Sequence, residues 1–264
     1  MSIIDELFAR TRAENRAALV GYLPAGFPDK ATSIAAIEAM VDGGVDLVEV
    51  GLPYSDPVMD GPVIQAAAEQ ALAAGTRISD VFDVVRASAA TGAPTVVMTY
   101  WNPVERYGVD RFAADLAEAG GAGLITPDLI PDEADEWIAA SEKHELSRIF
   151  LVAPSSTDIR IGYTADAASG FIYATAVMGV TGARDAVSSD APSLVERVRE
   201  HTDKPIGVGL GVSTGAQAAE VAQYADAVIV GSALVRKLLD TQSPSVGIDA
   251  VRALARELRT GVQR

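Results

Sequence analysis

The feature that most limits the fold of this chain is an alternation of short apolar runs with longer alanine-rich stretches across all 264 residues. The apolar runs carry little polar alternation, which is typical of parallel strands covered on both faces. The expected strands are Ala17–Leu23, Leu47–Gly51, Thr95–Tyr100, Gly123–Thr126, Arg148–Val152, Phe171–Ala174, Ile206–Gly209 and Ala227–Gly231.

The intervening stretches repeat apolar residues every three or four positions, which predicts helices. They are Lys30–Asp42, Val63–Ala74, Ile78–Ala90, Arg111–Ala119, Asp132–Lys143, Ala191–Glu200, Gly215–Gln223 and Ser245–Leu258. Strands that alternate with helices throughout, with no break in composition, predict one α/β domain over residues 1–264. About 250 residues suit a closed (β/α)8 TIM barrel, and the extra N-terminal helix at residues 2–14 would cover its floor.

Composition excludes several classes of function. The net charge of −15 disfavours nucleic acid, which rewards basic patches, and it disfavours anionic membranes. Backbone N–H groups at a helix start can still bind a phosphate. The chain has no cysteine, so disulfides, cysteine-bound metals and a cysteine nucleophile are excluded. No stretch has the length and apolarity of a membrane span, and the first residues lack a secretory pattern. A cytoplasmic protein is therefore expected.

Active sites of such barrels lie at the carboxyl ends of the strands, and Glu49 lies near that end of Leu47–Gly51. If Leu47 points inward, the two-residue period of a strand points Glu49 inward as well. A carboxyl group buried there without a partner should have a raised pKa, which suits proton transfer near neutral pH. A structural glutamate paired to a cation or a backbone N–H remains the alternative.

The loop that follows this strand carries two more carboxylates, Asp56 and Asp60. Pro53, Pro57 and Pro62 each fix one backbone angle and stiffen the loop. Aspartates in loops are usually turn formers. A rigid loop over the barrel mouth could instead aim a carboxylate at a ligand.

Residues 49–62 resemble the signature of the tryptophan synthase alpha chain family. The resemblance is specific, because a stretch so long and so mixed in composition rarely matches by chance. Residues 21–28, 98–103, 127–131 and 179–182 resemble the same family at its first, third, fourth and sixth strand ends. The similarity covers essentially the whole chain.

The resemblance implies a retro-aldol cleavage of indole-3-glycerol phosphate, with Glu49 as the acid/base and Asp60 as the second catalytic carboxylate. It also implies a lid within residues 175–189 that brings Thr181 towards Asp60. The implied indole-pocket residues, each of which could instead be ordinary core, are Tyr22 (more usually phenylalanine), Met98, Tyr100, Leu129 and Tyr173.

Glycine-containing turns follow the last three strands, at Gly182, Gly211 and Gly231. The helix expected after Ser232 offers free N–H groups and a favourable dipole for a phosphate. Barrels often bind phosphate at this place, so these four residues are expected to form a phosphate site, although any single glycine could merely form a turn.

The family resemblance implies a partner, the beta subunit, in an alpha2beta2 complex that passes indole between subunits. Asp56, Pro57, Asn102 and Pro103 would lie at that interface. Pyridoxal phosphate would belong to the beta subunit alone, and no cofactor or metal is expected here. No lysine stands at a strand carboxyl end, which argues against a Schiff-base aldolase.

Two alternatives stay open from the sequence. One is another phosphate-binding barrel, such as an isomerase or an indole-glycerol-phosphate synthase, which would place a different lysine or aspartate pattern at the strand ends. The other is a mainly structural or regulatory subunit with little activity of its own, in which the loop residues serve chiefly as a partner interface.

Overall fold

The structure is a computed structural model that describes residues 1–175, 190–209, 211–241 and 243–264. Within these ranges all strands belong to one parallel sheet. They are β1 (Ala18–Pro24), β2 (Leu47–Gly51), β3 (Thr95–Met98), β4 (Gly123–Ile125), β5 (Ser147–Ile149), β6 (Leu151–Val152), β7 (Ile172–Thr175), β8 (Ile206–Gly209) and β9 (Ala227–Val230). Their order in the sheet is β5-β4-β3-β2-β1-β9-β8-β7-β6.

The expected fifth strand is present as two pieces, β5 and β6, which Phe150 separates. On one side, Ile149 of β5 pairs with Ile125 of β4. On the other side, the carbonyl of Phe150 accepts a hydrogen bond from the N–H of Tyr173 in β7. The sheet therefore closes on itself through this short stretch, and the expected (β/α)8 barrel is confirmed.

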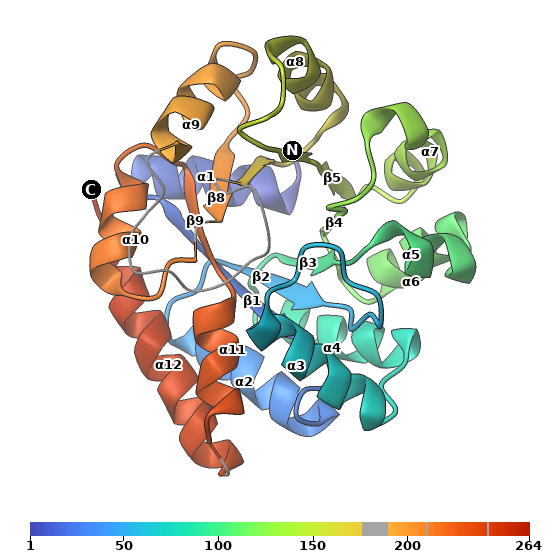
Figure 1. The fold of residues 1–264 in the computed structure, drawn as a ribbon, viewed down its shortest axis with the longest axis vertical. Helices are drawn as coiled ribbons and strands as arrows, with labels where there is room; N and C mark the ends of the chain where they lie inside the picture. The colour runs from blue at the N-terminus through green and yellow to red at the C-terminus, as the bar shows by residue number, and fades with distance from the viewer. Residues whose placement is uncertain (176–189, 210, 242) are drawn as a thin grey trace.

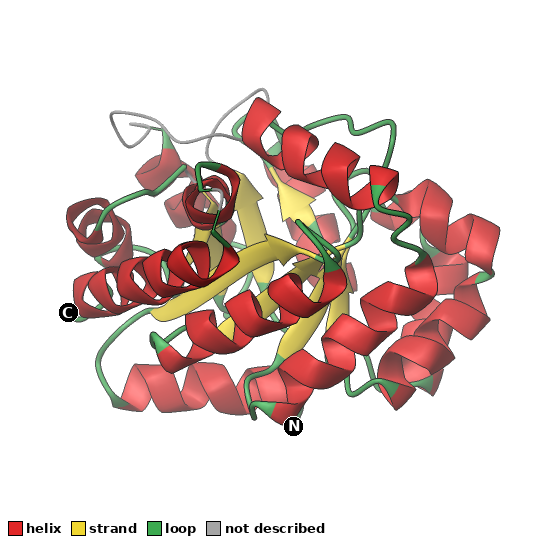
Figure 2. Ribbon diagram, turned by 90° about the horizontal axis from the view of Figure 1, so that it is seen from below, coloured by secondary structure: helices red, strands yellow, loops and turns green. Residues whose placement is uncertain are grey.

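Helices surround the sheet on its outer side, as Figures 1 and 2 show from two directions. They are α1 (Ile3–Ala13), α2 (Lys30–Asp42), α3 (Pro62–Ala73), α4 (Ile78–Ala90), α5 (Trp101–Tyr107), α6 (Val109–Glu118), the 3-10 helix η1 (Pro131–Glu133), α7 (Asp135–Lys143), α8 (Asp158–Ala167), α9 (Ala191–Arg199), α10 (Gly215–Ala222), α11 (Ser232–Leu239) and α12 (Pro244–Gly261). Among the described residues, no helix combines the length and the apolar character needed to cross a membrane.

Two of these helices, α5 and α8, do not appear among the expected ones. In α8 the helical spacing of apolar residues is hard to recognise in the sequence. Ile159 and Tyr163 are exposed, at 87% and 47%, so its apolar residues do not all lie on one face. In α5 the pair Asn102-Pro103 is typical of a turn. The proline is tolerated because it stands in the first helical turn, where backbone N–H groups lack intrahelical partners.

Helix α1 closes the amino-terminal end of the barrel, as expected for residues 2–14. Ser2 caps it and forms a reciprocal capping box with Asp5. Its Phe8 packs against Phe171, with ring centroids 5.8 Å apart. The buried interior cluster joins α1 to inward-facing strand residues: Ile4, Leu7, Phe8, Ala18, Val20, Leu47, Val96, Ile125, Ile149, Phe171, Tyr173, Ala227 and Ile229.

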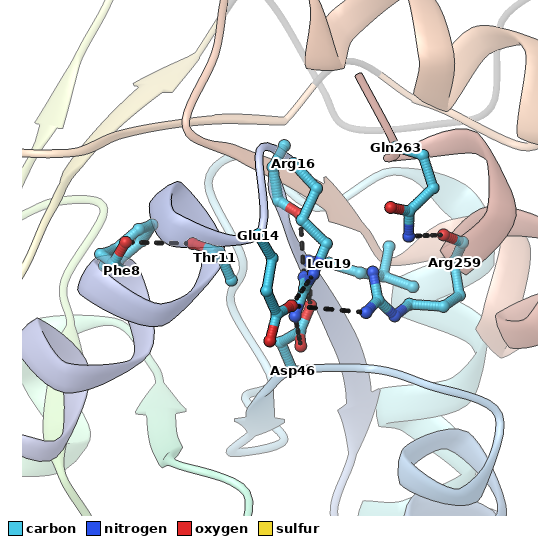
Figure 3. A network of polar contacts seen from close by, with 9 residues as sticks. Phe8, Thr11, Glu14, Arg16, Leu19, Asp46, Arg259 and Gln263 are labelled. Carbon is cyan, nitrogen blue, oxygen red and sulfur yellow. Dashed lines mark hydrogen bonds and ion pairs between the residues drawn. The ribbon is translucent and has the colours of Figure 1, made fainter.

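A buried ion pair fastens the same end of the barrel (Figure 3). The two terminal nitrogens of Arg16 lie 2.7 and 2.9 Å from the carboxylate oxygens of Asp46. That carboxylate also accepts the N–H of Leu19 at 2.9 Å. Nε of Arg16 donates to Glu14 at 2.5 Å, and Arg259 of α12 lies 3.9 Å from Glu14. These contacts join the end of α1, the starts of β1 and β2, and the last helix.

Candidate active site

Glu49 lies on the inner face of β2, two residues after the inward-facing Leu47, as the strand period predicts. It is 1% exposed, and its Oε1 has no hydrogen-bond partner among the described residues. Burial raises the pKa of Glu49 from 4.5 to about 8, because a carboxylate without partners is poorly solvated there. In the described part of the chain, neither a cation nor a backbone N–H binds this oxygen, as a purely structural glutamate would require.

Tyr22 and Tyr173 flank this carboxyl group inside the barrel. Burial raises the pKa of each phenol well above its usual value, and the charge of Glu49 raises both further. Both rings lie over strand ends that carry glycine. A Cβ added at Gly51 would lie 2.3 Å from the hydroxyl of Tyr22, and one at Gly209 would lie 2.4 Å from the hydroxyl of Tyr173. Glycine is required at both places because any side chain would displace a pocket tyrosine.

Asp60 ends the loop that follows β2, and it is held by contacts from two directions. The hydroxyl of Tyr100 donates to its Oδ1 at 3.0 Å, and the amide of Gln65 donates to its backbone carbonyl at 2.6 Å. Burial raises the pKa of Asp60, while the hydrogen bond from Tyr100 acts to lower it. Asp60 is less buried than Glu49, so the two carboxyl groups have different environments.

The charge of Asp60 also raises the pKa of Tyr22, after burial. Tyr22 thus lies within electrostatic reach of Glu49, Asp60, Tyr100 and Tyr173 at the carboxyl ends of the strands.

The two other expected lining residues lie at the end of β3 and after β4. Met98 ends β3, pairs with Gly51 and packs against the interior cluster. Leu129 follows β4, is 5% exposed, and packs into the larger apolar cluster between strands and helices.

The expected phosphate residues lie on neighbouring elements after β8 and β9. Gly211 adopts the left-handed conformation, with φ of 71°, which favours glycine. Gly231 is the N-cap of α11, and Ser232, its first residue, is 6% exposed. Within the described residues, the backbone N–H groups of Ser232 and Ala233 make no backbone hydrogen bond. Thr181 and Gly182 lie outside the described residues, as does most of the expected lid.

The expected partner residues lie around the loop after β2 and helix α5. Asp56 and Asn102 are exposed and Pro57 is partly exposed, whereas Pro103 is buried within this chain. The amide of Asn102 donates to the hydroxyl of Tyr54 at 3.0 Å. Asn102 and Pro103 also border a cavity of about 250 Å³ that lies between this loop, α4 and α5.

The lysines lie away from the strand carboxyl ends. Lys30 pairs with Asp80 and Asp83, Lys143 pairs with Asp110, and Lys204 donates to the carbonyl of Ala165. In the described ranges, no group of three or more histidine, aspartate or glutamate side chains could hold a metal ion.

One residue of the site escaped the sequence reasoning. Asp128 accepts the backbone N–H of Trp101 at 2.9 and 3.1 Å and so caps the start of α5, next to Tyr100. The sequence could have indicated Asp128, because it is a polar residue just after a strand and the carboxyl ends of the strands lie together at the active-site side of the barrel.

Comparison with known sequences identifies one family. The model of the family described as tryptophan synthase alpha chain matches residues 8–263. A relative of that description from Nocardia farcinica is 66% identical over 262 residues, which cover 99% of this chain and 96% of the relative. Another, from Mycobacterium tuberculosis, is 59% identical over 262 residues, with 99% and 95% covered.

Solved structures agree with the sequence comparison. A chain from a structure of Mycobacterium tuberculosis tryptophan synthase superposes with a TM-score of 0.94 at 58% identity, covering 100% of this chain and 99% of that one. The tryptophan synthase alpha subunit from Legionella pneumophila superposes with a TM-score of 0.88 at 33% identity, with 99% and 98% covered.

Proposed function

The chain belongs to the tryptophan synthase alpha chain family, and from that premise we propose that Glu49 and Asp60 share the proton transfers of its reaction. That reaction is the lyase step of tryptophan biosynthesis that cleaves indole-3-glycerol phosphate into indole and glyceraldehyde 3-phosphate. The observation that carries the proposal is a carboxyl group that is 1% exposed, with an oxygen that no described residue binds and a pKa of about 8.

Glu49 is protonated at neutral pH and gives its proton to carbon 3 of the indole ring. The bond between that carbon and the glycerol chain can break only after this transfer, because carbon 3 must be able to leave with the electron pair. The carboxylate that remains then takes the proton of the adjacent side-chain hydroxyl as its carbon becomes the aldehyde. Glu49 is protonated again at the end, so its two transfers balance.

Asp60 acts on the ring nitrogen. Its carboxylate accepts the N–H proton when protonation at carbon 3 forms the indolenine tautomer, and it returns that proton when the bond breaks and indole forms. The role needs an ionised group, which is favoured by the lesser burial of Asp60 and by the hydrogen bond from Tyr100. Two carboxyl groups in different environments can divide acid and base work in this way.

The phosphate of the substrate binds where β8 and β9 end. The free N–H groups at the start of α11 point to it, the helix dipole favours its charge, and the glycine backbones at Gly211 and Gly231 allow a close approach. In the proposal Gly182 completes the phosphate site, and Thr181 is brought towards Asp60 at the indole end. Tyr22, Met98, Tyr100, Leu129 and Tyr173 surround the indole ring.

The partner in this proposal is the tryptophan synthase beta subunit, in an alpha2beta2 complex, and its support is the similarity to chains from structures described as tryptophan synthase. Exposed Asp56 and Asn102, with the partly exposed Pro57, form the docking surface, and the buried Pro103 follows Asn102 in α5. The alpha reaction needs no cofactor in this chain because proton transfers by the two carboxyl groups are enough to let the carbon–carbon bond break; pyridoxal phosphate belongs to the beta subunit. A cytoplasmic location stays a prediction.

The test is the release of indole from indole-3-glycerol phosphate by purified chain, alone and with the beta subunit. We expect slow release alone and a large increase with the partner. Glu49→Gln should bind the substrate and lose nearly all cleavage, and Asp60→Asn should lose most of it. Turnover like that of the wild type by Glu49→Gln would remove Glu49 from the mechanism, and no turnover by the wild-type complex would favour a purely structural subunit.

A further inference from the structure

The hydroxyl of Tyr100 bridges the backbone and the carboxylate of the loop after β2. Tyr100 follows β3 and is the N-cap residue of α5. Its hydroxyl oxygen accepts the N–H of Met59 at 3.1 Å and donates to Oδ1 of Asp60 at 3.0 Å. One phenol group thus fixes both the path of the loop just before Asp60 and the direction of its carboxylate.

We propose that Tyr100 is a positioning residue for Asp60, which it holds in the orientation that receives the indole N–H. This assignment rests on the proposed function of Asp60 and goes beyond the lining role expected for Tyr100. A lining residue would contribute only apolar contact with the ring, through its aromatic face. A positioning residue acts through its hydroxyl, because that group makes both contacts with the loop.

Two contacts restrict Tyr100, one at the backbone beside it and one at its ring. Asp128 caps the start of α5 by accepting the N–H of Trp101, the residue that follows Tyr100. The ring of Tyr54 lies against the ring of Tyr100, with centroids 5.5 Å apart and planes tilted by 37°. Tyr54 in turn receives the hydrogen bond from Asn102. A side chain fixed in this way can orient a second group without loss of conformational freedom at each turnover.

The hydrogen bond also bears on ionisation. Burial raises the pKa of Asp60 and the bond from Tyr100 opposes that rise, because a donor stabilises the charged carboxylate. Among the described residues, the titratable groups whose own pKa the charge of Asp60 affects are Tyr22 of β1 and Tyr100. Both are phenols that stay neutral near neutral pH, so the bond from Tyr100 is the contact among the described residues that opposes the rise in the pKa of Asp60.

The experiment compares Tyr100→Phe with Tyr107→Phe in the full chain. Tyr107→Phe is the matched control, since it removes a hydroxyl from the last residue of α5, the helix that Tyr100 precedes, and that hydroxyl bonds Asp115 at 2.5 Å. The rate of indole-3-glycerol phosphate cleavage is measured across pH, and thermal unfolding verifies that each variant is folded. For Tyr100→Phe we expect kcat to fall by about tenfold to a hundredfold, the effect of losing a hydrogen bond to a charged group, with KM nearly unchanged.

The pH dependence of the cleavage rate should also change in Tyr100→Phe. The acid limb reports the group that must be ionised, so loss of the bond should move that limb of Tyr100→Phe to higher pH, while Tyr107→Phe keeps the wild-type limb. In an Asp60→Asn background, Tyr100→Phe should add little, since residues that act as a unit are not additive.

Three results would count against parts of this account. A wild-type kcat and pH profile in Tyr100→Phe, with Asp60→Asn inactive, would overturn the positioning role alone. A rise in KM without a change in kcat would return Tyr100 to pocket lining. Full activity in Asp60→Asn would instead overturn the proposed function of Asp60, whatever Tyr100 does.

Discussion

Tyr22 of β1 and Glu49 of β2 are direct register partners on neighbouring parallel strands, so the phenol ring and the carboxyl group lie at the same level of the barrel interior. The next inward position of β2 is Gly51, which leaves room for the phenol hydroxyl. The pair therefore combines an apolar wall with an acidic group that water does not reach. The proposed function places the indole ring against Tyr22, with its carbon 3 towards Glu49.

The burial of Glu49 predicts a stability gain when its charge is removed. The pKa is about 8 in the folded chain and near 4.5 when unfolded. Because the folded state holds the proton more tightly, the free energy of unfolding falls as pH rises from about 4.5 to about 8. Glu49→Gln has no charge to bury and does not lose stability in this way. Its melting temperature should therefore equal that of the wild type at low pH and exceed it increasingly as pH rises from about 4.5 to about 8. A constant difference between variant and wild type at every pH would contradict the raised pKa.

The start of α11 predicts an effect on phosphate binding. Ser232→Asp places a carboxylate among the N–H groups that would bind the phosphate, so the KM for indole-3-glycerol phosphate should rise by about tenfold, equivalent to ~1.4 kcal/mol. Ser232→Asn has nearly the same size without the charge and should change KM much less. Steady-state kinetics on both variants measures this. An equal effect of the two substitutions would place the phosphate elsewhere.

Gly209 predicts a packing effect on Tyr173. A methyl group at Gly209 would lie 2.4 Å from the hydroxyl of Tyr173, and such overpacking costs about 1–3 kcal/mol of stability. Gly209→Ala should therefore lower the urea midpoint and the cleavage rate, and adding Tyr173→Phe should recover part of both. A methyl group added at Gly231 would lie 3.4 Å from the nearest atom of Tyr22, which is an ordinary contact. Gly231→Ala should therefore unfold at nearly the wild-type midpoint. No recovery in the double variant would mean that Tyr173 is not the obstacle.

The ion pair between Arg16 and Asp46 predicts a stability effect without a catalytic one. Both side chains are largely buried, at 3% and 9% exposure, and a buried charge that loses its partner is costly. Asp46→Asn should lose about 3 kcal/mol or more of unfolding free energy and keep its kcat, because Asp46 lies at the opposite end of β2 from Gly51. Asp83→Asn, in an exposed pair with Lys30, should lose about 1 kcal/mol or less. Denaturant unfolding measures both, and equal losses would contradict the burial argument.

Periodicity predicted those parts of the molecule that depend on which face a residue occupies. The alternation from Leu47 to Glu49 correctly placed the carboxyl group inside the barrel, and the raised pKa follows from that placement. The split of the fifth strand at Phe150 was not predicted, because all of Arg148–Val152 is compatible with strand structure. Helix α8 was missed because exposed Ile159 and Tyr163 hide its apolar face.

Contacts between loops could not be predicted from the pattern. Tyr100 and Asp60 are 40 positions apart and lie in loops after different strands, so their hydrogen bond depends on a backbone path that no local period specifies. The same holds for Asp128, which caps α5 from the loop after β4. Thr181 and Gly182 stay predictions because they lie outside the described residues.

The most direct test of the central claim is the titration of Glu49 itself, by the infrared difference between wild type and Glu49→Gln as pH is raised. The account predicts a protonated carboxyl band at neutral pH that is lost near pH 8. A carboxylate that is already ionised at neutral pH, with its transition near 4.5, would contradict the account, since Glu49 would then have no proton to give.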